Sequence, residues 1–189
     1  MLCLLSYLLA GAAFAFGGEV TVVVDFDGAH SERSVQEMKR EAEEILKPSG
    51  VRLEWRAKSE VGRESYANLV LVRFKGRCVL EPVPILYDER GPYAFTYSSD
   101  GEVLPFTEVD CGHVTASVQS AMWGDDFARR DYLMGRALGR VVAHELVHVL
   151  TRSGTHAADG VGQTTLSGKD LVGAPLKLNR ADLERLKAK

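Results

Sequence analysis

The sequence predicts an α+β fold, α/β-like in its first half, in which a twisted mixed sheet carries an N-terminal helix and one long helix. Three observations support this prediction. Residues 20–26 form a β-branched run that is typical of a buried strand. Apolar residues between 34 and 46 recur at the spacing of an amphipathic helix. Apolar residues between 132 and 150 fall on more than one side of a helix, which indicates a long, largely buried helix.

Length and composition are those of one soluble domain. The chain has 189 residues, of which 46% are hydrophobic and 26% charged, and its net charge is −3. These values exclude a disordered chain and a polytopic membrane protein. The basic excess that is usual for nucleic-acid binding is missing, so we expect no nucleic-acid partner.

The N-terminus is typical of an export signal. Residues 1–18 contain no charged side chain, and their apolar run ends in an Ala-Phe-Ala sequence that favours cleavage after Ala15. We therefore expect a signal peptide at 1–18, a single domain at 19–189, and a secreted or periplasmic protein. No Lys or Arg precedes the run. An uncleaved anchor and a buried N-terminal element are therefore the alternatives, and membrane contact is expected only for the anchor.

Two cysteines follow the signal, Cys78 and Cys111, and export makes a disulfide between them the expected state. The bridge would close a loop of about 33 residues and stabilise the fold by about 3–4 kcal/mol in the chain-entropy model. The alternative is a pair of buried free thiols.

The first half of the domain predicts a strand, a helix and two more strands. Ser34 and Glu37 form a capping box at the start of the helix. Polar and apolar residues alternate at 51–56, as expected for a half-buried strand, and 68–74 is a further β-rich run.

A hairpin is predicted in the middle of the chain, because an Asp-Gly pair separates the β-rich runs 94–97 and 102–110. Pro105 predicts that 102–110 is the edge strand of the sheet. An extended peptide could dock on such an edge by strand addition.

The long helix is expected to begin between Asp126 and Asp131, and to end at Arg152 and Ser153 with Gly154 in the left-handed conformation. A short capping box follows at Ser167 and Asp170, and a last helix begins after Asn179. Four arginines spread along the long helix are expected to face solvent or to pair with acids: Arg129, Arg130, Arg136 and Arg140.

The long helix contains the motif with the clearest chemistry, the H-E-x-x-H sequence at 144–148. Side chains four residues apart share one helix face, so His144 and His148 can reach the same cation. Glu145 borders the same cleft, where it can accept a proton from a metal-bound water without being a ligand. The alternative is two core histidines satisfied by hydrogen bonds.

This stretch resembles the active-site helix of the zincin metallopeptidases. Its continuation at 151–156 is similar to the metzincin branch, in which the helix ends at a glycine and a third His completes the site. The resemblance implies that His144, His148 and His156 bind Zn²⁺ and that Glu145 is the general base. The chain departs from the metzincin pattern in a delayed third His, because Thr151 stands at the glycine position, and in lacking the methionine turn.

The third zinc ligand has alternatives to His156. Another zincin branch takes a Glu from a downstream helix, and Glu184 would be its counterpart here. Asp159 and Asp170 are the remaining candidates.

The resemblance predicts an exported zinc-dependent peptidase that acts on a peptide or protein substrate with a zinc-activated water. The alternatives are a catalytically inactive zinc-binding relative that acts as a binding module, and a structural domain without metal. A peptidase also needs a group that stabilises the developing oxyanion, for which Tyr93, Tyr97 and Arg152 are the candidates.

Overall fold

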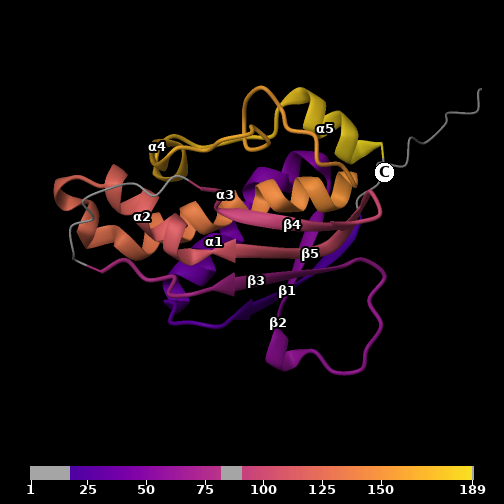
Figure 1. Ribbon diagram of the computed structural model, residues 1–189, viewed down its shortest axis with the longest axis horizontal. Helices are drawn as coiled ribbons and strands as arrows, with labels where there is room; N and C mark the ends of the chain where they lie inside the picture. Colours follow the sequence, from indigo (N-terminus) through magenta and orange to yellow (C-terminus); the bar gives the residue numbers. More distant parts are fainter. Residues whose placement is uncertain (1–17, 82–90, 189) are drawn as a thin grey trace, which may run out of the picture.

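The computed structural model describes residues 18–81 and 91–188, and the predicted signal peptide therefore lies almost wholly outside the described residues. The predicted α+β class is confirmed, because a five-stranded mixed sheet packs against helices (Figure 1). The main elements are β1 (Glu19–Phe26), α1 (Glu32–Leu46), β2 (Arg52–Ala57), β3 (Leu69–Lys75), β4 (Ala94–Ser99), β5 (Glu102–Asp110), α2 (Cys111–Ala121), α3 (Arg130–Thr151), α4 (Gly168–Val172) and α5 (Arg180–Lys187).

The sheet has the strand order β2-β1-β3-β5-β4, in which only β4 runs antiparallel to its neighbour. The prediction that 102–110 is the edge strand is therefore wrong, because β5 lies between β3 and β4. Pro105 is tolerated there for a local reason. Pairing of β5 with β3 begins only at Phe106, and the register with β4 shifts between Thr96 and Ser98, opposite this stretch. The edge on this side of the sheet is β4.

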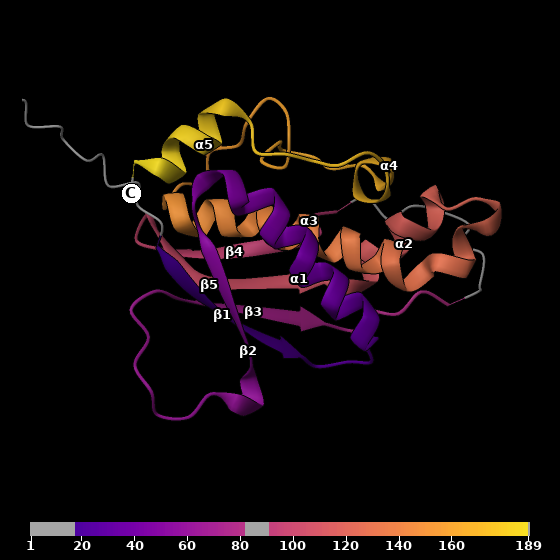
Figure 2. The same cartoon turned by 180° about the vertical axis from the view of Figure 1, so that it is seen from behind.

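The core lies between one face of the sheet and the two long helices. Alternate side chains of β1 and β3 point into it, including Val22 and Val72, which are fully buried. Figures 1 and 2 show α1 and α3 on the same side of the sheet, with the C-terminal segment beyond α3. None of the helices in the described part of the chain is long and apolar enough to cross a membrane.

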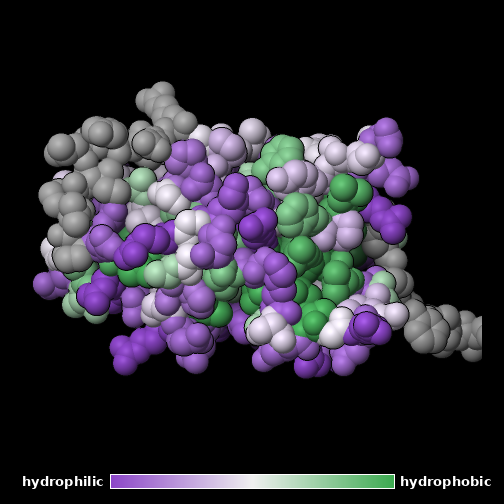
Figure 3. Space-filling model, turned by 60° about the horizontal axis from the view of Figure 1, so that its bottom comes forward, coloured by the Kyte–Doolittle hydropathy of each residue, from purple (hydrophilic) through white to green (hydrophobic). Residues whose placement is uncertain are grey.

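The opposite face of the sheet carries an apolar row. Val23 pairs with Leu71, and Leu71 pairs with Phe106, so these side chains lie side by side across three strands. The ring of Tyr97 stacks on Phe106 with its centroid 4.6 Å away. Figure 3 shows apolar side chains gathered on part of the surface, with polar side chains around them.

Helix α1 begins earlier than the predicted capping box requires. Its N-cap is Ser31, and Ser34 lies inside the first turn, where it is buried. The Ser34 hydroxyl donates to the carbonyl oxygen of Asp131 at 3.0 Å, and the Ser31 hydroxyl donates to the Asp131 carboxylate at 3.1 Å. Both serines therefore tie the start of α1 to the start of α3.

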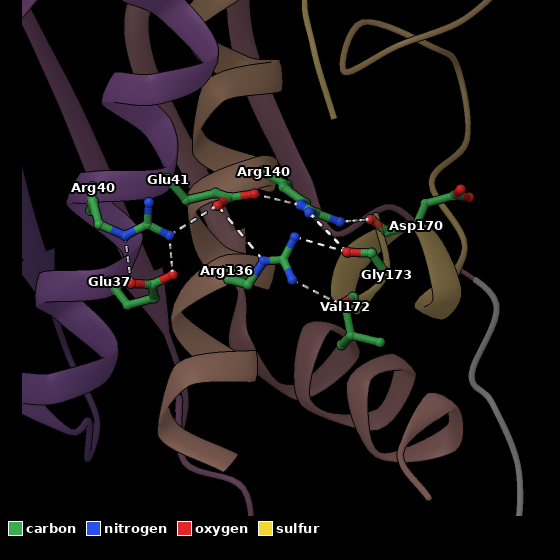
Figure 4. A network of polar contacts seen from close by, with 8 residues as sticks. All are labelled: Glu37, Arg40, Glu41, Arg136, Arg140, Asp170, Val172 and Gly173. Atoms are coloured by element: carbon green, nitrogen blue, oxygen red, sulfur yellow. Dashed lines mark hydrogen bonds and ion pairs between the residues drawn. The ribbon is translucent and has the colours of Figure 1, made fainter. Parts of the chain in front are cut away.

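Helices α1 and α3 pack closely, and a buried ion pair lies at their contact (Figure 4). Arg140 Nε donates to Glu41 Oε1 at 2.8 Å, and the Arg140 side chain is 0% exposed. Arg136 also faces Glu41 and donates to the carbonyl oxygens of Val172 and Gly173. The expectation of a solvated face is thus wrong for these two arginines, and the alternative of pairing with an acid is correct.

Helix α2 has no counterpart in the predictions. It follows β5 without a loop, and Asp110 caps it by accepting a hydrogen bond from the backbone N–H of His113. Its residues of low helix propensity, such as Gly112 and Thr115, are the reason that the sequence pattern did not predict a helix here. Its first residue, Cys111, forms the predicted disulfide with Cys78, and both cysteines are fully buried.

Candidate metal centre

Three histidines converge near the end of α3. His144 and His148 lie one turn apart on the same face of the helix, and their Nε2 atoms are 3.0 Å from each other. The ring centroid of His156 is 5.2 Å from that of His144 and 4.7 Å from that of His148. One ligand atom from each of the three residues lies within 4.8 Å of the others, so the cluster could hold a metal ion.

Backbone carbonyls orient the two helical imidazoles. His144 Nδ1 lies 2.8 Å from the carbonyl oxygen of Val161, and His148 Nδ1 lies 2.7 Å from that of Ser153. A carbonyl can only accept, so Nδ1 carries the proton in both rings and Nε2 has a free lone pair. Two such lone pairs at 3.0 Å repel each other unless a cation lies between them. Both rings therefore turn Nε2 toward a possible metal ion, while the carbonyl oxygens of Val161 and Ser153 hold their Nδ1 side.

The end of α3 creates one of these partners. Arg152, with φ 51°, takes the left-handed position, and the N–H of Ser153 donates to the carbonyl of His148 at 3.1 Å. The prediction of Gly154 for that position is wrong. The chain reverses two residues earlier, because the backbone bonds that close the last turn end at Ser153. That reversal brings the Ser153 carbonyl back to the ring of His148.

The loop after α3 presents the third imidazole. The loop closes on itself where the N–H of Ala157 donates to the carbonyl oxygen of Gly162 at 2.7 Å. It is also tied to the C-terminal segment, because the N–H of Val161 donates to the carbonyl oxygen of Lys177 at 2.9 Å. His156 precedes this junction and is exposed, whereas His148 is buried. The site therefore has a closed side, formed by the helix, and an open side.

The spacing of the ligand atoms fits a small cation. Zinc–nitrogen bonds of about 2.0–2.1 Å in a tetrahedron place two ligand nitrogens roughly 3.4 Å apart. The observed values, 3.0 Å between His144 and His148 and at most 4.8 Å within the triad, bracket that distance. Three imidazoles also leave one position of a tetrahedron for a water or a substrate.

The alternative third ligands lie outside this cluster. Glu184 is exposed and pairs with Arg180 at 2.8 Å. Asp170 accepts from the backbone and side chain of Ser167 as the predicted capping box of α4. Asp159 is exposed and is not a member of the histidine group.

Burial favours the neutral form of two of the three imidazoles, His144 and His156. Burial lowers the pKa of His144 below its ordinary value, against the opposing effect of the hydrogen bond to Val161. Partial burial, together with the neighbouring imidazoles of His148 and His144, lowers the pKa of His156. The neutral ring is the form that binds a metal.

Glu145 lies beside the triad and points toward the sheet. Its Oε2 accepts hydrogen bonds from the hydroxyls of Thr96 on β4 at 2.5 Å and Thr107 on β5 at 3.2 Å. Sequence reasoning missed both threonines. The one available signal is that Thr107 is polar, whereas Val109, two residues on and therefore on the same face of the strand, is apolar.

A cavity of about 690 Å³ opens onto the histidines and Glu145. Its lining includes Tyr93 just before β4, Thr96 within β4, and the segment 163–166. Of the three candidates for an oxyanion-stabilising group, only Tyr93 borders this cavity. Tyr97 stacks on the other face of the sheet, and Arg152 is exposed at the end of α3.

No family model matches the chain, and a search of curated proteins finds no significant match. What the protein does is therefore inferred from the side chains of this site and their geometry.

Proposed function

We propose that the chain is an exported zinc-dependent peptidase with His144, His148 and His156 as metal ligands and Glu145 as the general base. The observation that carries the proposal is the convergence of three imidazoles and one carboxylate at the wall of a single cavity. Three protein ligands with an open fourth position are the arrangement of catalytic rather than structural zinc. The resemblance of 144–156 to the zincin peptidases supports the same reaction.

Zinc is the metal that suits this donor set. Imidazole nitrogens bind Zn²⁺, Cu²⁺ and Ni²⁺ more strongly than Mg²⁺ or Ca²⁺, and three protein ligands with one open position are typical of catalytic zinc. When bound, Zn²⁺ polarises a carbonyl group and lowers the pKa of a water ligand to about 7.

Glu145 supplies the proton transfer in this proposal. Its carboxylate takes a proton from the attacking water as the carbon–oxygen bond forms, and delivers it to the amine nitrogen as the carbon–nitrogen bond breaks. Tyr93 is the proposed oxyanion-stabilising group, because it lines the cavity with the imidazoles. Its hydroxyl donates to Ser117 Oγ at 2.7 Å in this structure, so it would have to turn toward the substrate.

The substrate is proposed to bind as an extended peptide along β4. This strand is the edge of the sheet next to the cavity, and among the described strands it pairs only with β5. An edge strand offers backbone N–H and C=O groups to an added strand. Docking on β4 replaces the sequence-based expectation of docking on 102–110.

Export is supported by the disulfide. Buried disulfides persist in oxidising compartments, and the bridge between Cys78 and Cys111 is fully buried. A cleaved N-terminal signal and secretion or transfer to a periplasm accord with it.

Metal analysis and a cleavage assay test the proposal together. Protein purified from an oxidising compartment should contain about one zinc per chain by mass spectrometry. His156→Ala should lose the metal, and His30→Ala, which replaces a histidine outside the cluster, should keep it. Glu145→Gln should keep the zinc and lose cleavage of a fluorescence-quenched peptide library.

Two outcomes would contradict the proposal. Wild-type protein that stays free of metal after zinc is added would leave the motif as part of a structural domain. Protein that binds zinc but cleaves no peptide of the library would be the inactive binding relative.

A further inference from the structure

Two hydroxyls from neighbouring strands converge on one oxygen of the proposed base. Thr96 and Thr107 are directly paired across β4 and β5. Both side chains point to the face that carries α3, and both lie within hydrogen-bond distance of Glu145 Oε2. Cross-strand pairs hold their side chains at a constant separation, so the acceptor position between the two hydroxyls is determined by the sheet.

The arrangement is asymmetric at the carboxylate. Oε2 accepts from both threonines, whereas Oε1 accepts no hydrogen bond from the residues that the structure describes. Glu145 is 5% exposed, and buried carboxylate oxygens need hydrogen-bond partners. Oε2 has its partners in the two threonines, and Oε1 is left for a proton transfer.

We infer that Thr96 and Thr107 are positioning residues, which hold the Glu145 carboxylate by Oε2 and keep Oε1 available to the reacting atoms. The inference rests on the proposed function for its kinetic test. It assigns a catalytic task to β4 and β5 beyond the binding of a peptide backbone.

Removal of the hydroxyls at constant shape tests the inference. The variants are Thr96→Val, Thr107→Val and the double variant, with Thr96→Ser as the conservative replacement. Thr21→Val is the matched control, because Thr21, like Thr107, is a buried strand threonine, and its hydroxyl lies 3.4 Å from Glu54 Oε2, away from the site.

Kinetics on the best-cleaved library peptide should separate positioning from binding. A misplaced catalytic group costs roughly 10- to 100-fold in rate, so kcat of the Val variants should fall by that factor with KM unchanged. Thr96→Ser should restore kcat, and zinc content should equal that of wild type in every variant. Loss of kcat with loss of zinc, or no rescue by Ser, would assign the threonines a structural role and overturn the inference.

A second readout does not depend on cleavage. The side-chain carboxyl carbon of Glu145 is assigned in ¹³C NMR spectra by comparison with Glu145→Gln. Its resonance should shift in Thr96→Val and in the double variant, and should stay in place in Thr21→Val. An unchanged resonance would overturn the inference even in an active enzyme. If the wild-type protein cleaves no peptide but the resonance still shifts in the Thr96→Val variant, the positioning would be supported and the peptidase proposal refuted.

Discussion

The carboxylate of Asp182 lies against Gly162, so closely that a β-carbon at position 162 would overlap its Oδ2 atom. Asp182 belongs to α5 and is fully buried. Gly162 follows Val161, whose carbonyl accepts the Nδ1–H of His144. Helix α5 therefore packs directly against the segment 161–162, whose carbonyl at Val161 orients the proposed metal ligand His144.

Gly162→Ala should weaken zinc binding, because the added methyl must displace either Asp182 or the Val161 carbonyl. Loss of an outer partner of a ligating imidazole typically costs 10–100-fold in metal affinity. Competition with a chelating dye measures the affinity. Gly154→Ala is the control, because a β-carbon there meets no atom within 4 Å. Equal zinc affinities of the two variants would show that the position of the segment 161–162 does not affect metal binding.

Glu41→Gln should destabilise the fold strongly. Arg140 is fully buried and would lose the carboxylate that balances its charge, keeping only neutral acceptors, the amide oxygen of the new Gln and the backbone carbonyls. Removal of one member of a buried ion pair costs about 3–5 kcal/mol. Urea unfolding measures the loss, with Glu44→Gln as the control, because Glu44 is exposed on the same helix and should change the free energy by less than about 0.5 kcal/mol. Similar values for both variants would mean that neutral hydrogen-bond acceptors satisfy Arg140 without a carboxylate.

Gly139→Ala should destabilise the protein although alanine favours a helix by about 1 kcal/mol. Its β-carbon would lie 2.7 Å from the carbonyl oxygen of Met38 and 2.7 Å from the β-carbon of Glu41. Separation of the helices to relieve such overlap costs about 1–3 kcal/mol, which exceeds the propensity gain. Thermal unfolding should show a lower Tm. Gly62→Ala, in open space, should leave Tm unchanged or raise it, and a raised Tm for Gly139→Ala would contradict the close packing.

Replacement of both Cys78 and Cys111 by alanine should cost about 3–4 kcal/mol, because the unfolded chain regains the freedom of the loop that the bridge closes. The two residues are 33 positions apart. Guanidinium unfolding of the wild type and the double variant measures the difference. The zinc content of the folded variant should match that of the wild type, since neither cysteine belongs to the histidine cluster. An unchanged free energy would mean that the unfolded chain is already compact in this region.

Much of this structure was open to prediction because its causes are local. The i, i+4 spacing of His144 and His148 places both on one helix face whatever surrounds the helix. Strand periodicity predicted β1, β2 and β3, and the predicted disulfide between Cys78 and Cys111 is present. The errors have tertiary causes. Ser34 bonds to Asp131 instead of capping α1, and Pro105 lies in an interior strand at a position where neither neighbour needs its N–H.

The amino-acid order alone places two histidines and a glutamate on one long helix at the spacing of a metal site, and the proposed chemistry follows from that spacing. Three further contacts could be learned only from the folded chain: His156 reaches the two helical imidazoles, Arg140 is buried against Glu41, and Thr96 and Thr107 meet at Glu145. The difference lies in the distance along the chain over which each pattern acts. Helix periodicity acts over four residues, whereas these contacts depend on how the sheet, the helices and the last loop pack together, which no local pattern encodes.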